Sequence, residues 1–275
     1  MAFVRVLEGD FYFERHRALA QKPRPHSVFI QHGVGRNSGF WQHWIEPLRL
    51  EREVVLRDQR GHGQSPAPGP DYPWTLQAML DDLLGFFDAL ELGAVHYIGE
   101  SMGAVLGVAL AARCPQRFAS LTLCSMPSDL RQSRSSRALR AGFDSSAAAK
   151  RELGAAGWAR QLMQAGVISS GQDASYAQWA IDQIGQIELD ALMGVSRPLY
   201  EPSTDWKAFL NALQVPVLLL APTRSPVTSL EDQHWIASQI ADVRVVEIDS
   251  PSHEAYVDRP KECQQAVCAF IGELP

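Results

Sequence analysis

The segment from residue 95 to residue 112 restricts the folds open to this chain more than any other part of its sequence. An apolar run begins at Val95, the pattern Gly-Glu-Ser-Met-Gly follows at residues 99–103, and small and aliphatic residues then continue to Ala112. This order predicts a strand, a tight turn with Ser101 at its tip, and a helix. Glycine is required two residues before and after the serine because a side chain there would collide with the neighbouring strand and helix. We therefore expect Ser101 in a strained conformation at the carboxyl edge of a sheet, beside the free N–H groups of a helix start.

Strand patterns and helix patterns alternate along most of the chain. An apolar–polar alternation from Phe3 to Arg15 predicts an N-terminal β-hairpin with its two-residue turn at Gly9 and Asp10. Such alternation is typical of an α/β fold with a mostly parallel sheet covered on both faces, here of about eight strands. The short β-rich runs that follow the hairpin are Ser27–Gln31, Val54–Arg57, Val95–Ile98, Leu121–Cys124, Val217–Leu220 and Val243–Ile248.

One long interval interrupts this alternation. Between Cys124 and Val217 the sequence shows about ninety residues of helical periodicity with glycine and proline breaks and no convincing strand. We interpret residues 127–213 as an inserted helical lid, which divides the core into residues 1–126 and 214–275.

Four arginines of the predicted lid recur at every third residue, which places them on one slowly drifting helix face. A solvated surface is the simpler interpretation of such a face, and recognition of an anionic substrate is the alternative. The four are Arg131, Arg134, Arg137 and Arg140.

Composition and charge narrow the functional classes. The 275 residues are 46% hydrophobic and 20% charged, as in globular proteins, and the net charge of −6 offers no positive surface for nucleic acid. The longest apolar stretch, Ala104–Ala112, is about half of the ~20 residues that a membrane helix needs, and Met1–Asp10 lacks the features of a signal peptide. We therefore expect a cytoplasmic protein with a small-molecule substrate, no cofactor, and no nucleic-acid or membrane partner, and a homodimer is left open.

Three further motifs accompany the serine turn. His32 and Gly33 directly follow a predicted strand, residues 58–65 read DQRGHGQS, and residues 252–260 read SHEAYVDRP. In this order the motifs resemble the HG oxyanion segment, the D-x-R-G-x-G-x-S loop, the G-x-S-x-G nucleophile elbow and the G-H-x-x-x-x-E-R-P segment of the α/β-hydrolase family. The resemblance covers essentially the whole chain and is nearest to lidded small-molecule hydrolases, such as enol-lactonases, carboxylesterases and C–C bond hydrolases.

The resemblance implies a role for particular residues. Ser101 would be the nucleophile, and His253, on the loop after the last predicted strand, would be the base that takes its proton. The backbone N–H groups of Val34 and Met102 would bind the oxyanion. No metal ligand is expected.

The acid of the expected triad is missing from both places where the family carries one. After the strand Val217–Leu220 the acid position holds Ser225, and the alternative position after the preceding strand holds Ser125. Ser225 could orient His253 through a neutral hydrogen bond, and Asp129 could reach it if its loop folds back. The remaining candidates are Asp249, Glu231 and Asp232, although the last two also fit a capping box at the start of a helix.

The motifs favour a serine hydrolase that cleaves a small carboxylic ester or lactone through an acyl-enzyme on Ser101. A C–C bond hydrolase or a cofactor-independent dioxygenase is the alternative, because some relatives use the histidine as a base toward the substrate. A ligand-binding receptor with vestigial chemistry is a third hypothesis, which the incomplete triad alone supports.

Overall fold

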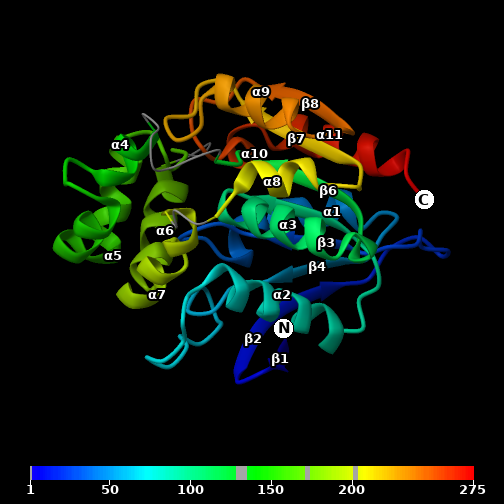
Figure 1. The fold of residues 1–275 in the computed structure, drawn as a ribbon, viewed down its shortest axis with the longest axis horizontal. Coiled ribbons are helices and arrows are strands. Elements are labelled where there is room, and N and C mark those ends of the chain that lie inside the picture. The colour runs from blue at the N-terminus through cyan, green and yellow to red at the C-terminus, as the bar shows by residue number, and fades with distance from the viewer. Residues whose placement is uncertain (1, 128–134, 171–173, 201–203) are drawn as a thin grey trace.

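The computed structural model describes residues 2–127, 135–170, 174–200 and 204–275, and its centre is an eight-stranded sheet (Figure 1). The strand order is β1-β2-β4-β3-β5-β6-β7-β8, with β1 and β2 antiparallel to their neighbours and all other pairs parallel. The predicted α/β fold and all of the predicted strands are therefore confirmed. The strands are β1 (Ala2–Val6), β2 (Gly9–His16), β3 (Val28–Gln31), β4 (Val54–Arg57), β5 (Val95–Glu100), β6 (Phe118–Cys124), β7 (Val217–Pro222) and β8 (Val243–Ile248).

Helices cover both faces of the sheet. The chain passes from β3 to β4 in one direction and from β4 through β5 and β6 to β7 in the other, so right-handed crossovers place α1 opposite α2, α3 and α8. Accordingly α1 packs against α11, while α3 packs against α2 and α8. These core helices are α1 (Gln42–Leu48), α2 (Leu76–Ala89), α3 (Met102–Arg113), α8 (Trp206–Asn211), α9 (Leu230–Ser238), α10 (Ala255–Asp258) and α11 (Pro260–Gly272). Across the described ranges, no helix has the length and apolar character needed to span a membrane.

The middle of the sheet forms the hydrophobic core. Every residue of β3, β4, β5 and β7 is buried, whereas edge strand β8 is partly exposed. Strands covered on both faces explain why the sequence showed continuous apolar runs there rather than alternation. Because β3 to β8 are parallel, their carboxyl ends meet at one edge, where the loops that carry the candidate site begin.

The N-terminal hairpin forms, but its turn lies two residues earlier than the sequence predicts. Val6 pairs with Gly9, so Leu7 and Glu8 make the turn, and Gly9 and Asp10 belong to β2. Leu7 adopts a positive φ of 51° without being a glycine. Gly9 serves another purpose, because a Cβ there would lie within 1.8 Å of the Arg60 guanidinium. The glycine marks a close packing contact rather than the turn.

A helical insertion, which we define as the described residues between β6 and β7, leaves the sheet at its carboxyl edge. It contains no strand in its described part, and α4, α5, α6 and α7 lie together beside the sheet (Figure 1), whereas α8 packs on core helix α3. The domain boundaries at 127 and 213 stay predictions. Of the predicted arginine face, Arg137 and Arg140 lie on α4, and Arg131 and Arg134 lie outside the described residues. The elements of the helical insertion are α4 (Ser135–Arg140), α5 (Ser146–Gln164), α6 (Ala174–Gly185), α7 (Leu189–Gly194), the short helix η3 (Arg197–Tyr200) and α8.

Candidate active site

Ser101 lies at the tip of the turn that joins β5 to α3. Its φ and ψ are 51° and −113°, a strained conformation for a residue with a Cβ, and its N–H donates to the carbonyl of Cys124 at 3.0 Å. A Cβ on Gly103 would lie 2.2 Å from the carbonyl oxygen of Gln31, and one on Gly99 would lie 2.5 Å from that of Gly103. The two glycines therefore allow the close approach of backbone segments that this turn requires, as the sequence predicts.

The loop after β3 passes directly over this turn. His32 Nε2 accepts the N–H of Gln59 at 3.0 Å, and its Nδ1–H donates to the carbonyl of Gly33 at 2.8 Å. Burial, together with the neighbouring charges, keeps the pKa of His32 well below its usual range. The ring is therefore neutral, and its two hydrogen bonds hold the loop in place. Val34 follows at the cavity wall, and Met102 is the first residue of α3, where backbone N–H groups have no partner within the helix.

Ser101 and His253 line one narrow cavity of about 40 Å³. Its walls combine residues from the core loops with residues from the helical insertion, and charged side chains of both signs reach it. The structure thus brings the proposed nucleophile, the proposed base and one proposed oxyanion residue to one place. Its charged lining residues are Arg36, Glu100 and Lys150.

His253 meets an uncharged partner on its Nδ1 side. Ser225 Oγ lies 3.2 Å from Nδ1 and also accepts the backbone N–H groups of Val227 and Thr228, each at 3.2 Å. A hydroxyl has two acceptor positions and one proton, so the two amides favour donation of that proton to Nδ1. The ring then carries its own proton on Nε2. A carboxylate in the place of Ser225 would enforce the opposite tautomer.

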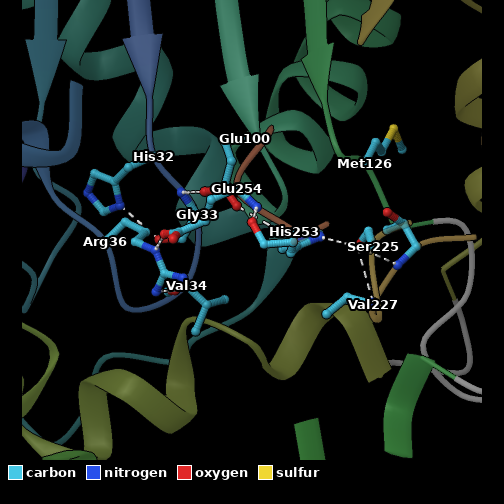
Figure 2. A network of polar contacts seen from close by, with 12 residues as sticks. His32, Gly33, Val34, Arg36, Glu100, Met126, Ser225, Val227, His253 and Glu254 are labelled. Carbon is cyan, nitrogen blue, oxygen red and sulfur yellow. Dashed lines mark hydrogen bonds and ion pairs between the residues drawn. The ribbon is translucent and has the colours of Figure 1, made fainter. Parts of the chain in front are cut away.

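The Nε2 side of His253 faces a carboxyl group instead. Glu100 Oε1 lies 3.7 Å from Nε2, which makes no hydrogen bond to any described residue, and Figure 2 shows the ring between Glu100 and Ser225. Glu100 Oε2 accepts the N–H of Gly33 at 2.8 Å. Burial raises the pKa of Glu100 to about 7, with Arg36 acting in the opposite direction. Burial, and then the charge of Arg36, lowers the pKa of His253 to about 3.

A buried ion pair lies beside these groups. Arg36 Nε donates to Glu254 Oε1, and the two side chains are 4% and 0% exposed. The second Glu254 oxygen accepts the N–H of Ser169 in the helical insertion at 2.6 Å. Burial opposes the charge on Arg36, but Glu254 and Glu100 outweigh it and raise its pKa. Both members of the pair act on Glu100, whose pKa Arg36 lowers and Glu254 raises.

The other acids proposed from the sequence do not contact His253 in the described structure. Asp249 is exposed and pairs with Arg224 at 2.7 Å. Asp232 completes the capping box of α9 with Ser229, as its alternative interpretation predicts, and Glu231 lies in the same first turn. Asp129 falls outside the described residues. Of the candidates for orienting the histidine, only Ser225 is placed at the ring among the residues that the structure describes.

Sequence reasoning missed the charged groups of the site. In the sequence, Glu100 occupies a variable position of the GESMG motif, and Glu254 follows His253. Their adjacency to the proposed nucleophile and base was the available signal. Neither occupies a position where the family pattern places an acid, and only the packing of separate loops brings them together with Arg36.

Comparison with known proteins identifies the family of the chain. Residues 27–260 match the family model described as alpha/beta hydrolase fold, and the chain belongs to this family. It is 26% identical to "Putative carbamate hydrolase RutD" of Azorhizobium caulinodans, over 100% of this chain and 99% of the relative. It is 24% identical to 3-oxoadipate enol-lactonase 1 of Acinetobacter baylyi, over 90% and 89% of the two chains. The crystal structure of the enol-lactonase from Burkholderia xenovorans superposes with a TM-score of 0.81 at 22% identity, over 98% of this chain and 100% of the other. The protein is accordingly a hydrolase.

Proposed function

We propose that this hydrolase cleaves a small carboxylic ester or lactone through a covalent acyl-enzyme on Ser101. The observation that carries the proposal is the strained placement of Ser101 at the start of α3, in the same cavity as His253. A serine in this conformation exposes its hydroxyl, and the unpaired backbone N–H groups at the start of the helix point toward a bound carbonyl.

The reaction begins when Ser101 Oγ attacks the carbonyl carbon and its proton passes to Nε2 of His253. The N–H groups of Val34 and Met102 hold the oxyanion, each contributing about 10²–10³ in rate, as a single donor does elsewhere. His253 returns the proton to the leaving oxygen as the C–O bond breaks. A water molecule then hydrolyses the acyl-enzyme by the same sequence of steps.

The protonated His253 needs a negative partner, and Glu100 is the nearest carboxyl group on the Nε2 side. We infer that the Glu100 carboxylate stabilises the imidazolium in place of the missing triad acid. To accept the Ser101 proton, Nε2 of His253 must be unprotonated. The hydrogen bond from Ser225 favours the opposite tautomer, with the proton on Nε2. Only the fraction of enzyme whose ring carries Nδ1–H, donated to Ser225, is therefore ready to react. This requirement favours substrates with good leaving groups, which demand less of the base.

The relatives support this reaction class. An enol-lactonase opens a cyclic ester and a carbamate hydrolase cleaves a carbamate, so both names describe hydrolysis of a bond between a carbonyl carbon and a heteroatom. We extend to this chain only their shared reaction type.

A fluorophosphonate probe tests the proposal directly. We expect one adduct on Ser101 of the native protein and none on Ser101→Ala, as measured by intact-protein mass and peptide mapping. Turnover of p-nitrophenyl butyrate should fall by about 10⁴-fold or more in Ser101→Ala, because the covalent route depends on the hydroxyl. Unlabelled native protein, or a variant that retains most of its turnover, would count against the acyl-enzyme.

The uncharged Nδ1 partner of His253 supports a second candidate function. A C–C bond hydrolase or a cofactor-independent dioxygenase would use His253 toward the substrate itself and Ser101 mainly for binding. In that case Ser101→Ala would weaken turnover without abolishing it, and oxygen consumption would distinguish the dioxygenase.

A further inference from the structure

A buried lysine of the helical insertion lines the cavity that also holds Ser101 and His253. Lys150, on α5, is 1% exposed, and its ammonium group donates to the carbonyl of Leu192 and to Ser196 Oγ, both at 3.1 Å. It also lies 4.6 Å from the centre of the Trp158 ring. These contacts use two of its three N–H donors, and no described carboxylate forms an ion pair with it. Burial lowers the pKa of Lys150 to about 7.

A second cavity, of about 430 Å³, adjoins the first at Lys150, Ser196 and Tyr200. Two exposed cations, Arg151 and Arg197, stand along it, and no Asp or Glu is among the described residues that line it. The chain as a whole has a net charge of −6, so this positive region runs against its overall charge. Cavities lined by one sign of charge concentrate ligands of the opposite sign.

The predicted arginine face reaches the same region through one of its members. Burial raises the pKa of Tyr200, and the charge of Arg140 on α4 acts in the opposite direction, so Arg140 lies near a residue that lines both cavities. Arg140 thus contributes positive charge around Tyr200, and the choice between the two interpretations of that face stays open.

Helix capping does not explain why the buried group is a lysine. Leu192 lies in the last turn of α7, where its carbonyl has no partner within the helix and can accept a hydrogen bond from a side chain. A neutral amide would satisfy this carbonyl, whereas a buried ammonium without an anion is costly. A bound anion would offset that cost and occupy the remaining N–H.

We propose that Lys150 binds a carboxylate carried by the substrate, so that the enzyme prefers esters or lactones of dicarboxylic acids to neutral ones. The proposal rests on the ester or lactone hydrolysis described above. The carboxylate would lie at the junction of the two cavities, with Arg151 and Arg197 attracting it from solvent. A compact, planar anion suits the narrow inner cavity.

The test compares p-nitrophenyl hemiglutarate with p-nitrophenyl pentanoate, two esters of similar length that differ in the terminal carboxylate. We expect native kcat/KM to favour the hemiglutarate, after subtraction of an enzyme-free blank, and the ratio to fall by about 10- to 100-fold in Lys150→Gln, as for loss of a charged hydrogen bond. Lys150→Arg should retain part of the preference because it retains the charge. Lys261→Gln, on the exposed side of α11, is the matched control and should keep the native ratio.

Two outcomes would overturn the proposal while leaving the proposed function standing. Native enzyme that is labelled at Ser101 and hydrolyses both esters equally would show that no carboxylate site exists. A Lys150→Gln variant with a lower melting temperature but an unchanged ratio would show that Lys150 only caps α7. Absence of Ser101 labelling would instead refute the proposed function itself.

Discussion

The two sides of the His253 ring differ in the kind of group that meets each nitrogen. Nδ1 meets Ser225, a neutral hydroxyl that also accepts two backbone amides, on the loop between β7 and α9. Nε2 faces Glu100 at 3.7 Å, next to the buried pair of Arg36 and Glu254. An acid at the position of Ser225, where the family pattern carries one, would put the charge on the Nδ1 side. Here the charged groups lie on the side of the nucleophile.

If Glu100 acts as we propose, a catalytic charge can be displaced without a change of fold. A carboxylate on Nδ1 fixes the tautomer and stabilises the imidazolium at once. In our proposal Ser225 and Glu100 divide these two tasks, and Ser225 performs the first poorly because it can donate as well as accept. The following substitutions test the two sides separately.

The largest effect is expected on the charged side, from Arg36→Met. The change leaves Glu254 buried without its partner, which should lower the free energy of unfolding by about 3–5 kcal/mol. Arg224→Met is the matched control, because its pair with Asp249 is exposed and should contribute less than about 1 kcal/mol. Urea denaturation measures the free energy of unfolding of both variants. Equal losses would mean that the buried pair stabilises the fold no more than the exposed pair does.

Glu100→Gln removes the charge that faces Nε2 but keeps an acceptor for the Gly33 N–H. We expect kcat/KM for p-nitrophenyl butyrate to fall by about 100-fold at pH 8, less than the ~10⁴ lost when an acid on Nδ1 is disturbed.

The same variant should change the pH profile. With its pKa at about 7, Glu100 becomes ionised as the pH rises through 7, so native activity should rise over that interval and then level off. Glu100→Gln should lack this rise and match the native enzyme near pH 5. His253, with its pKa at about 3, is already neutral across this range and does not contribute. An unchanged rise in the variant would assign it to another group.

The smallest effects are expected on the uncharged side. Ser225→Ala should change kcat by less than about threefold, since it removes only neutral hydrogen bonds, two from backbone amides and one to His253 that favours the unreactive tautomer. Ser225→Asp should raise kcat by about tenfold, because an aspartate can only accept from Nδ1–H when it is ionised. Circular dichroism would establish that both variants fold, and a folded Ser225→Asp enzyme without any gain would refute the tautomer argument.

The sequence was sufficient for the sheet and for the serine turn because both depend on local patterns. Runs such as Val217–Leu220 are buried on both faces, and the glycines around Ser101 are fixed by short contacts within one supersecondary unit. The hairpin turn failed for a different reason. Gly9 suggests a turn in the sequence, but a glycine is needed there because Arg60, a distant residue, packs against it. The actual turn includes Leu7 at a positive φ.

The charged part of the site was out of reach because it is assembled from distant loops. Arg36 and Glu254 are separated by 218 positions, and Glu100 meets Gly33 across 67. No spacing rule connects such positions. The sequence predicts Ser225 at the position where the family pattern carries an acid, and the structure places that hydroxyl at Nδ1 of His253, whereas the proximity of Glu100 to Nε2 could be found only once the loops were packed together.

The backbone of residues 167–169 links the histidine loop to the helical insertion. His253 N–H donates to the carbonyl of Val167 at 3.3 Å, and Glu254 accepts the N–H of Ser169 at 2.6 Å. Val167 also lines the cavity that holds Ser101. A displacement of this backbone would therefore strain the loop that carries His253. The position of the proposed base thus depends on the helical insertion as well as on the sheet to which its own loop belongs.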